Sequence, residues 1–401
     1  MNTYLPLLQP YPFEKLHQLK DAVPTPSVEP HISLSIGEPQ HAPPQFVLDT
    51  LKDNLGEISR YPSTIGTLEL RQVMSDWASR RFQLTKGSLS PEQHILPVNG
   101  TREALFAFIQ ACFDSSSKKK QIVMPNPFYQ IYEGAALLAG AQPVFLNCES
   151  HNQFLPDFDA VSDKQWQSCQ VLFICTPGNP TGAVLPLATL QKLISLADKF
   201  NFIIASDECY SELYFDENAP PPGLLQACAV MGRDDYRRCI VFHSLSKRSN
   251  LPGLRSGFVA GDSALIKPFL LYRTYHGCAM PLPSQLASIA AWKDEGHVQK
   301  NRDLYREKFA KVHDILSSSL RFTMPQAGFY LWPETPIDET LFAQQLYAQQ
   351  NVTVLPGSYL ARDAQGGNPG RGHVRMALAA TLAHCIEAAE RIKHFVHQGN
   401  Y

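Results

Sequence analysis

The chain has 401 residues, of which 44% are hydrophobic, and its formal net charge at pH 7 is −2. This length supplies material for a large buried core and for two or three domains. Because 35 basic residues are balanced by 37 acidic ones, the composition gives no electrostatic reason to expect binding to nucleic acid or to an anionic membrane.

The middle of the chain alternates short apolar runs with amphipathic stretches, a pattern typical of a mostly parallel sheet with helices between its strands. The predicted strands are residues 94–98, 121–124, 143–146, 171–175, 202–206, 239–242 and 257–260. The amphipathic stretches between them predict helices at residues 102–112, 131–139 and 187–200.

A mainly helical stretch at residues 284–311, with Gly296 as a candidate break, separates this pattern from a different one. Beyond it, an α+β pattern predicts strands at residues 329–332, 352–354 and 373–378 and helices at residues 339–349 and 382–397. We therefore predict an α/β fold whose large domain, residues 45–290, has a mostly parallel seven-stranded sheet flanked by helices. A smaller α+β domain would combine residues 1–44 with residues 291–401.

Neither the start of the chain nor its cysteines point to export. No basic segment followed by an apolar one opens the sequence, and no apolar run approaches membrane-spanning length. The nine cysteines have no C-x-x-C spacing, which suits reduced thiols better than disulfides or a zinc site. We therefore expect a cytoplasmic protein with no metal and no membrane partner.

The predicted strand at residues 239–242 leads into a serine-rich turn, Ser244-Leu-Ser246-Lys247, and Arg255 follows after a Pro-Gly break. A lysine at the end of a strand, with hydroxyl groups and a guanidinium nearby, suits a Schiff base to a phosphorylated aldehyde. The pKa of free lysine is about 10.4, so burial or imine formation must lower it for the amine to react near neutral pH. The alternative is an ordinary surface lysine.

Two other predicted strands end in polar groups at the same edge of the sheet, where open α/β sheets bind ligands. Gly100, Thr101 and Arg102 stand where a strand turns into a helix, and Thr101 with the helix amides can hold a phosphate. A plain helix cap by Thr101 is the alternative. The Pro- and Gly-rich segment 176–182 fixes a turn that presents the side chain of Asn179.

The predicted strand at residues 202–206 ends in Asp207, and Tyr210 follows shortly after. A carboxylate at the end of a buried strand is costly unless it is paired, so Asp207 either caps a helix or pairs with a cation such as a protonated pyridine nitrogen. At about 3 Å and an effective dielectric near 20, Coulomb's law gives roughly 5 kcal/mol, which raises a pyridine pKa by roughly three units or more. A ring kept protonated in this way is the electron sink that carbanion chemistry needs.

Together these motifs resemble the fold-type I, class I and II aminotransferases that depend on pyridoxal 5′-phosphate, and the resemblance covers nearly the whole chain. It implies the fold of that family, a homodimer, and amino acids and 2-oxo acids as substrates. By this resemblance Lys247 holds the cofactor as an imine and moves the reacting proton. Asp207 pairs with the pyridine nitrogen, and Asn179 and Tyr210 form hydrogen bonds to the phenolic oxygen.

The same resemblance assigns the other cofactor residues. Those expected around the cofactor phosphate are Gly100, Thr101, Ser244, Ser246 and Arg255, with Arg102 as a further cofactor residue. Tyr129 falls where the family stacks an aromatic ring on the cofactor, and Phe128 is the register-shifted alternative because stacking needs only a flat apolar face. Tyr61 matches a tyrosine that reaches the phosphate from the neighbouring subunit, so the homodimer would share its active sites. A packing tyrosine is the alternative.

For the substrate, Arg375 matches the family's arginine for the α-carboxylate, with Gly37 and Asn179 beside it. Within the family, the chain is most similar to the proteobacterial N-succinyldiaminopimelate aminotransferases in residues 7–15, 33–39, 244–262 and 357–362. This similarity implies transfer between N-succinyl-2-amino-6-ketopimelate and glutamate in diaminopimelate and lysine synthesis.

One departure argues against an aspartate-like specificity. Aspartate aminotransferases carry an arginine for the distal carboxylate in the region matching residues 275–283, where this chain has none, and Arg273, just before this region, is the register-shifted alternative. Another aminotransferase or a β-eliminating lyase of the same fold would share these motifs, because the motifs serve the cofactor. A cofactor-sensing domain of a transcription regulator would need a basic DNA-binding segment ahead of it, and this chain is not basic.

Overall fold

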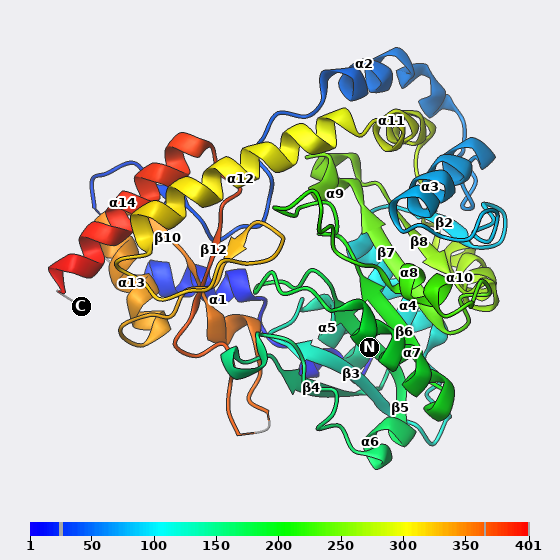
Figure 1. Ribbon diagram of the computed structural model, residues 1–401, viewed down its shortest axis with the longest axis horizontal. Coiled ribbons are helices and arrows are strands. Elements are labelled where there is room, and N and C mark those ends of the chain that lie inside the picture. The colour runs from blue at the N-terminus through cyan, green and yellow to red at the C-terminus, as the bar shows by residue number, and fades with distance from the viewer. Residues whose placement is uncertain (24–26, 365, 400–401) are drawn as a thin grey trace.

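The computed structural model describes residues 1–23, 27–364 and 366–399. Figure 1 shows two parts, a sheet with its helices and a smaller part that contains both the first helix and the last. The long helix α12 (Gly296–Leu316) runs from one part to the other. Residues 24–26, 365 and 400–401, which fall within the ranges predicted for the smaller domain, lie outside the described residues.

The larger part is built on a seven-stranded sheet in the order β2-β8-β7-β6-β5-β3-β4. Its strands are β2 (Ile95–Val98), β3 (Gln121–Asn126), β4 (Gln142–Asn147), β5 (Cys169–Cys175), β6 (Ile203–Asp207), β7 (Cys239–Ser244) and β8 (Gly257–Gly261). Strand β8 runs antiparallel to its neighbours β2 and β7, whereas the pairs from β7 to β4 are parallel. The prediction of an α/β fold with a mostly parallel seven-stranded sheet is confirmed.

Helices cover both faces of this sheet. Successive residues of a strand point to opposite sides, so each strand packs against both helix layers. Val123 of β3 packs into one helix layer, whereas Ile122 and Met124 pack into the other. The first layer consists of α3 (Leu68–Arg81), α7 (Leu187–Phe200), α8 (Leu224–Val230) and α11 (Leu282–Lys293). The second consists of α4 (Thr101–Cys112), α5 (Ile131–Leu138) and α10 (Ser263–His276). Burial on both sides explains why the strands are continuous apolar runs in the sequence.

The smaller part has a hydrophobic core of its own, to which both ends of the chain contribute. Its three-stranded antiparallel sheet, β11-β12-β9, consists of β9 (Tyr330–Leu331), β11 (Leu355–Pro356) and β12 (Val374–Ala377). Near the N-terminus, β1 (Ile32–Ser33) pairs in parallel with β10 (Val352–Thr353). The surrounding helices are α1 (Pro12–Asp21), α13 (Glu339–Gln350), α14 (Leu382–Gln398) and part of α12. The domain boundary between residues 290 and 291 stays a prediction, and it falls within α11.

The helical stretch predicted at residues 284–311 consists of two helices. Helix α11 ends at Lys293, and α12 begins at Gly296, the residue predicted as a candidate break. Asp294 lies between them with an extended backbone (φ −104°, ψ 127°), and its Oδ1 accepts a hydrogen bond from His297 N at 2.8 Å. This carboxylate supplies an acceptor for an otherwise unpaired amide at the start of α12.

The remaining elements are short. They are α2 (Gln45–Asp53), α6 (Asp163–Ser168), α9 (Leu245–Arg248) and the 3-10 turns Leu5–Leu7, Leu55–Ser59, Ser150–Asn152, Pro252–Leu254 and Gly357–Leu360. Within the described ranges, no helix is both long enough and apolar enough to span a membrane. The same residues contain no group of three His, Cys, Asp or Glu side chains placed to hold a metal ion.

Candidate active site

A cavity of about 540 Å³ opens at the carboxyl edge of the sheet and is lined by residues of both parts. Strands β5, β6 and β7 end beside it, as expected for a ligand site in an open α/β sheet. The predicted site residues that line the cavity are Gly37, Thr101, Arg102, Tyr129, Asn179, Asp207, Tyr210, Ser244, Ser246, Lys247, Arg255 and Arg375. The other two predicted residues, Gly100 and Tyr61, do not line it.

Lys247 lies in the one-turn helix α9, which directly follows β7. Ser244 fixes this turn, because its side-chain oxygen accepts a hydrogen bond from Ser246 N at 3.1 Å. The Nζ atom of Lys247 donates a hydrogen bond to the carbonyl oxygen of Gly37. Burial lowers the pKa of Lys247 to about 8, so a useful fraction of the amine is neutral and nucleophilic near neutral pH. The alternative of an ordinary surface lysine is wrong.

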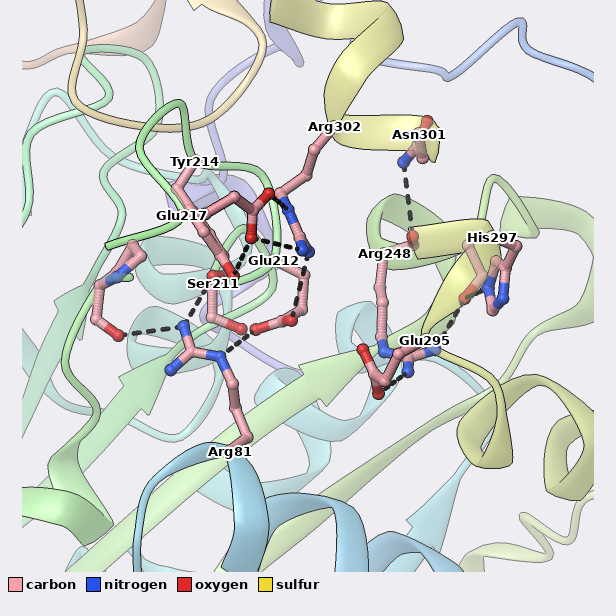
Figure 2. Close-up of polar contacts among 12 residues, drawn as sticks. Arg81, Ser211, Glu212, Tyr214, Glu217, Arg248, Glu295, His297, Asn301 and Arg302 are labelled. Carbon is pink, nitrogen blue, oxygen red and sulfur yellow. Dashed lines mark hydrogen bonds and ion pairs between the residues drawn. The ribbon is translucent and has the colours of Figure 1, made fainter. Parts of the chain in front are cut away.

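Helix α12 holds the backbone of the lysine turn, as Figure 2 shows. Nδ2 of Asn301 donates a hydrogen bond to the carbonyl oxygen of Lys247 at 3.2 Å. It also donates to the carbonyl oxygen of Arg248 at 3.4 Å, the contact drawn in Figure 2. The fully buried guanidinium of Arg248 donates to Glu295 Oε1 at 2.6 Å and lies 4.8 Å from the centre of the Trp292 ring. A buried cation needs such a charged partner. The reactive turn is therefore fixed to the helix that links the two parts of the chain.

The loop that follows Tyr210 is tied to α12 as well (Figure 2). Arg302 donates hydrogen bonds to both carboxylate oxygens of Glu217, at 2.8 and 3.0 Å. From the other side, Arg81 of α3 donates to Glu212 Oε1 at 2.6 Å. Burial alone would raise the pKa of Glu217, but its hydrogen bonds with the arginines of α12 lower it to about 2. These ion pairs hold the loop, and with it Tyr210, over the whole neutral pH range.

Asp207 ends β6 and is 4% exposed. Its Oδ2 accepts a hydrogen bond from the Tyr132 hydroxyl at 2.7 Å, and its Oδ1 accepts one from Cys209 N at 3.2 Å. Both donors are neutral, and burial raises the pKa of Asp207. A cationic ring nitrogen in the cavity would supply the charged partner that these donors do not. The helix-cap alternative is wrong, because the next helix, α8, begins only at Leu224.

Gly100 lets the guanidinium of Arg255 approach the start of α4. Its φ is +86°, a value that favours glycine, and a Cβ atom there would lie 2.1 Å from Nη2 of Arg255. The guanidinium donates hydrogen bonds to the carbonyl oxygens of Pro252, at 2.7 Å, and of Asn99, at 3.3 Å. These contacts fix a cation at the wall of the cavity.

Thr101 is the first residue of α4, and Gly100 occupies the cap position, so the interpretation of Thr101 as a plain helix cap is wrong. Thr101, Ser244 and Ser246, each of which carries a hydroxyl, line the same cavity as Arg255. Hydroxyls, a guanidinium and the first amides of α4 are together suited to a phosphate dianion. With Lys247 and Asp207 in the same cavity, this donor set fits pyridoxal phosphate.

Of the two adjacent aromatic candidates, Tyr129 lines the cavity and Phe128 does not. Phe128 is 1% exposed and stacks on Phe145, with the ring centres 5.2 Å apart. The hydroxyl of Tyr129 accepts a hydrogen bond from Arg102 Nε at 2.6 Å, which fixes the Tyr129 ring at the cavity wall. The Phe128 alternative is therefore wrong, whereas stacking of Tyr129 on the cofactor stays a prediction.

Tyr61 lies outside the cavity, and its side chain is fully exposed. A packing role within its own chain is therefore wrong. Leu55 and Ile58 in the same segment are also exposed, at 52% and 73%. A contact with the phosphate of a neighbouring subunit requires Tyr61 to point away from its own chain, and this contact stays a prediction.

Arg375 on β12 is 4% exposed and is fixed by two hydrogen bonds. Its Nη1 donates to Asn179 Oδ1 at 3.0 Å, and its Nη2 donates to the carbonyl oxygen of Ser35 at 2.8 Å. The guanidinium lies 4.5 Å from the centre of the Tyr330 ring. Gly37 admits this tyrosine, because a Cβ atom at position 37 would lie 2.0 Å from its hydroxyl oxygen. A fixed guanidinium at the cavity wall is suited to bind a carboxylate.

Arg273 does not supply the missing arginine for a distal carboxylate. It is fully buried on α10, and its Nη1 donates to both carboxylate oxygens of Glu103, at 2.7 and 2.6 Å. It does not line the cavity. Arg273 therefore does not replace the arginine that binds the distal carboxylate in aspartate aminotransferases.

Sequence reasoning missed two tyrosines that complete the site. Tyr132 donates to Asp207, and the hydroxyl oxygen of Tyr330 lies 3.0 Å from that of Tyr210. The helical pattern places Tyr132 in the first turn of α5 but gives no signal for its contact with Asp207, which is 75 positions away in the chain. Tyr330 gave no such signal, because it is 120 positions from Tyr210 in the chain.

The chain matches the family model described as aminotransferase class I and II over residues 29–392. An LL-diaminopimelate aminotransferase of Nitratidesulfovibrio vulgaris is 32% identical to it over 394 residues, which cover 97% of each chain. A solved aminotransferase from Neisseria meningitidis has 49% identity and a TM-score of 0.93, with 98% of this chain and 100% of that one covered. A probable N-succinyldiaminopimelate aminotransferase from Thermus thermophilus has 25% identity and a TM-score of 0.84, with 96% and 99% covered.

The family match spans both parts of the chain and every residue of the cavity described above except Tyr11 and Phe13 at its edge. Members of this family depend on pyridoxal 5′-phosphate, and the donors around Lys247, Asp207 and Arg255 fit that cofactor. The chain therefore belongs to the class I and II aminotransferases and is a pyridoxal-phosphate-dependent aminotransferase.

Proposed function

We propose that this aminotransferase transfers an amino group between N-succinyl-LL-2,6-diaminopimelate and 2-oxoglutarate by a ping-pong mechanism in diaminopimelate and lysine synthesis. The sequence similarity to N-succinyldiaminopimelate aminotransferases supports this proposal, as does the name of the Thermus thermophilus neighbour. The observation that carries it is a cation at the cavity that the cofactor and the α-carboxylate do not need.

That cation is Arg102. The described residues lining the cavity include Lys247, Arg255 and Arg375, which we assign to the cofactor, its phosphate and the substrate α-carboxylate, and Arg102 is left over. Its exposed side chain is anchored on the Tyr129 hydroxyl. At the end distal to its reacting amine and α-carboxylate, N-succinyl-LL-diaminopimelate carries two carboxylates and no ammonium group. A guanidinium is suited to bind such a group, so we assign Arg102 to the distal carboxylates rather than to the cofactor.

A second candidate substrate is unmodified LL-diaminopimelate, which the relative from Nitratidesulfovibrio vulgaris is named for. Its distal end carries one ammonium and one carboxylate group. Glu38 lines the same cavity and could pair with that ammonium. The two substrates therefore differ in the charge that the distal end of the cavity must accept.

The chain's own residues would divide the reaction as follows. When bound, pyridoxal phosphate supplies the electron sink for negative charge on the carbon that carries the amino group. Arg375 orients the substrate carboxylate, and Asp207 keeps the ring nitrogen protonated. The Nζ atom of Lys247 would remove the proton from the substrate α-carbon and return it at C4′ of the cofactor.

The substrate proposal is tested by the first half-reaction, followed in a single turnover as pyridoxamine phosphate forms. We expect kcat/KM for N-succinyl-LL-diaminopimelate to exceed that for LL-diaminopimelate by roughly 10- to 100-fold, since a charged hydrogen bond is worth about 1.5–3 kcal/mol. Arg102→Gln should remove most of this preference, whereas Arg321→Gln, at an exposed arginine that does not line the cavity, should not.

Three outcomes would contradict the proposal. A preference for LL-diaminopimelate that is lost in Glu38→Gln would favour the second candidate. Equal use of both donors, unchanged in Arg102→Gln, would leave another class I and II aminotransferase activity. Release of ammonia or pyruvate without pyridoxamine phosphate would identify a β-eliminating lyase.

We also propose that the enzyme is a homodimer with shared active sites. The support is the exposed segment of Leu55, Ile58 and Tyr61, since apolar side chains gathered on a surface are typical of protein interfaces. In this arrangement the Tyr61 hydroxyl would complete the phosphate site of the neighbouring subunit.

The pH dependence of cofactor capture should follow Lys247. Because burial lowers its pKa to about 8, the neutral amine increases about tenfold per pH unit below pH 8 and levels off above it. We therefore expect the rate at which the apoenzyme captures pyridoxal phosphate to rise and then level off in the same way, measured by stopped-flow absorbance at constant ionic strength. A rate that continues to rise to about pH 10 would indicate an ordinary, solvated lysine.

A further inference from the structure

Tyr330 contacts both halves of the site, although the smaller part of the chain supplies it. It lies on β9, beside β12, and is 3% exposed. Its hydroxyl oxygen lies 3.0 Å from that of Tyr210, and its ring lies under the guanidinium of Arg375 at 4.5 Å. A Cβ atom at Gly37 would lie 2.0 Å from the same hydroxyl, so the backbone on that side leaves room for this side chain.

We propose that Tyr330 is a positioning residue with two separable functions. Its hydroxyl directs the hydrogen of Tyr210 toward the cofactor, and its ring supports Arg375 against the substrate carboxylate. The proposal goes beyond the substrate assignment and rests on the predicted hydrogen bond from Tyr210 to the phenolic oxygen of the cofactor.

The first function follows from the two hydroxyls. Each has one hydrogen, and the 3.0 Å contact uses only one of them. If Tyr330 donates to Tyr210, the Tyr210 hydrogen is free to point at the cofactor. Accepting a hydrogen bond also makes a hydroxyl a stronger donor, because neighbouring hydrogen bonds polarise one another.

This relay has a spectroscopic consequence. The bound cofactor changes colour when it loses the proton shared between the nitrogen from Lys247 and the cofactor's own phenolic oxygen. A donor to that oxygen competes for it, so the proton is lost at lower pH. Loss of the Tyr330 hydroxyl weakens the donor and should raise the midpoint of the colour change.

The second function follows from the ring. A cation over an aromatic face gains attraction from the ring quadrupole, and this gain is larger when the pair is desolvated. Arg375 and Tyr330 are both buried, so the ring supports the guanidinium beside Asn179, to which the guanidinium donates at 3.0 Å. Removing the ring should therefore weaken substrate binding, whereas removing only the hydroxyl should not.

Two variants of the holoenzyme separate these functions. In Tyr330→Phe we expect the absorbance midpoint to rise by roughly 0.5–1 pH unit, which matches the loss of one net hydrogen bond, with KM for the amino donor nearly unchanged. In Tyr330→Leu we expect the same rise and, in addition, a KM increase of roughly 3- to 30-fold from the lost cation–π contact.

Tyr305→Phe is the matched control. Tyr305 is 1% exposed and stacks on Phe329, next to Tyr330, but its hydroxyl has no hydrogen-bond partner among the described residues. Its loss should leave the midpoint and KM unchanged. A wild-type midpoint in Tyr330→Phe, or a wild-type KM in Tyr330→Leu, would overturn the corresponding function. The titration uses no substrate, so its result is independent of whether the substrate is succinylated.

Discussion

Lys247→Ala should lower steady-state transamination by roughly 10⁵-fold or more, because it removes the group to which we assign the covalent link to the cofactor and the transfer of the reacting proton. The donors for the phosphate stay in place, so the variant should still bind pyridoxal phosphate without a covalent bond. Turnover assays measure the first effect, and equilibrium dialysis of the cofactor measures the second. Turnover close to that of the unmodified enzyme would contradict the role of Lys247.

Lys308 offers a matched control for this experiment. It is 2% exposed, and burial lowers its pKa to about 8, as for Lys247. Its Nζ donates to the carbonyl oxygen of Leu378 at 3.2 Å, and it does not line the cavity. The Lys308→Met variant should catalyse steady-state transamination at the rate of the unmodified enzyme. In the unmodified enzyme, borohydride reduction followed by peptide mapping should attach the cofactor to Lys247, and a label on Lys308 would show that burial alone selects the lysine.

Asp207→Asn should lower kcat by roughly 10³-fold or more. The amide has the shape of the carboxylate but no charge, so the ring nitrogen that we assign to Asp207 would lose about 5 kcal/mol of stabilisation for its proton. Single-turnover rates of proton removal measure the loss. A cofactor analogue methylated on the ring nitrogen is cationic at every pH, and it should restore part of the rate in the variant. No rescue, together with normal binding of the analogue, would count against the charge of Asp207 as the cause.

Glu208 provides the control for Asp207. It is the next residue and is 1% exposed, but its Oε1 accepts hydrogen bonds from Ser206 Oγ at 2.9 Å and Leu224 N at 2.8 Å. Burial raises its pKa to about 7, so it is largely uncharged in mildly acidic solution. Because Glu208 does not line the cavity, the Glu208→Gln variant should remove the substrate proton at the rate of the unmodified enzyme.

The strands of the large sheet could be predicted because burial on both faces makes each one a continuous apolar run. Their carboxyl ends could be predicted to meet, which brought Asn179, Asp207 and Lys247 into one cavity. The break between α11 and α12 could be located because Gly296 interrupts an otherwise helical pattern. In each case the signal lies within a few residues of the feature.

The contacts that complete the site could not be predicted in this way. Tyr132 is 75 positions from Asp207, and Tyr330 is 120 positions from Tyr210, so these hydrogen bonds depend on how distant segments pack. The choice between Phe128 and Tyr129 had the same difficulty, because it depends on the packing of Phe128 against Phe145. A sequence pattern contains the period of an element but not its neighbours in space.

The ion pair between Arg248 and Glu295 has a consequence for protein synthesis. A nascent chain that ends at the boundary predicted near residue 290 contains Arg248 but neither Glu295 nor Asn301. In the complete chain, where Arg248 is buried, loss of this carboxylate alone would cost about 3–5 kcal/mol, a large share of the total stability of a typical domain. The lysine turn therefore acquires the ion pair of Arg248 and its hydrogen bonds from Asn301 only after the ribosome has released the first turns of α12.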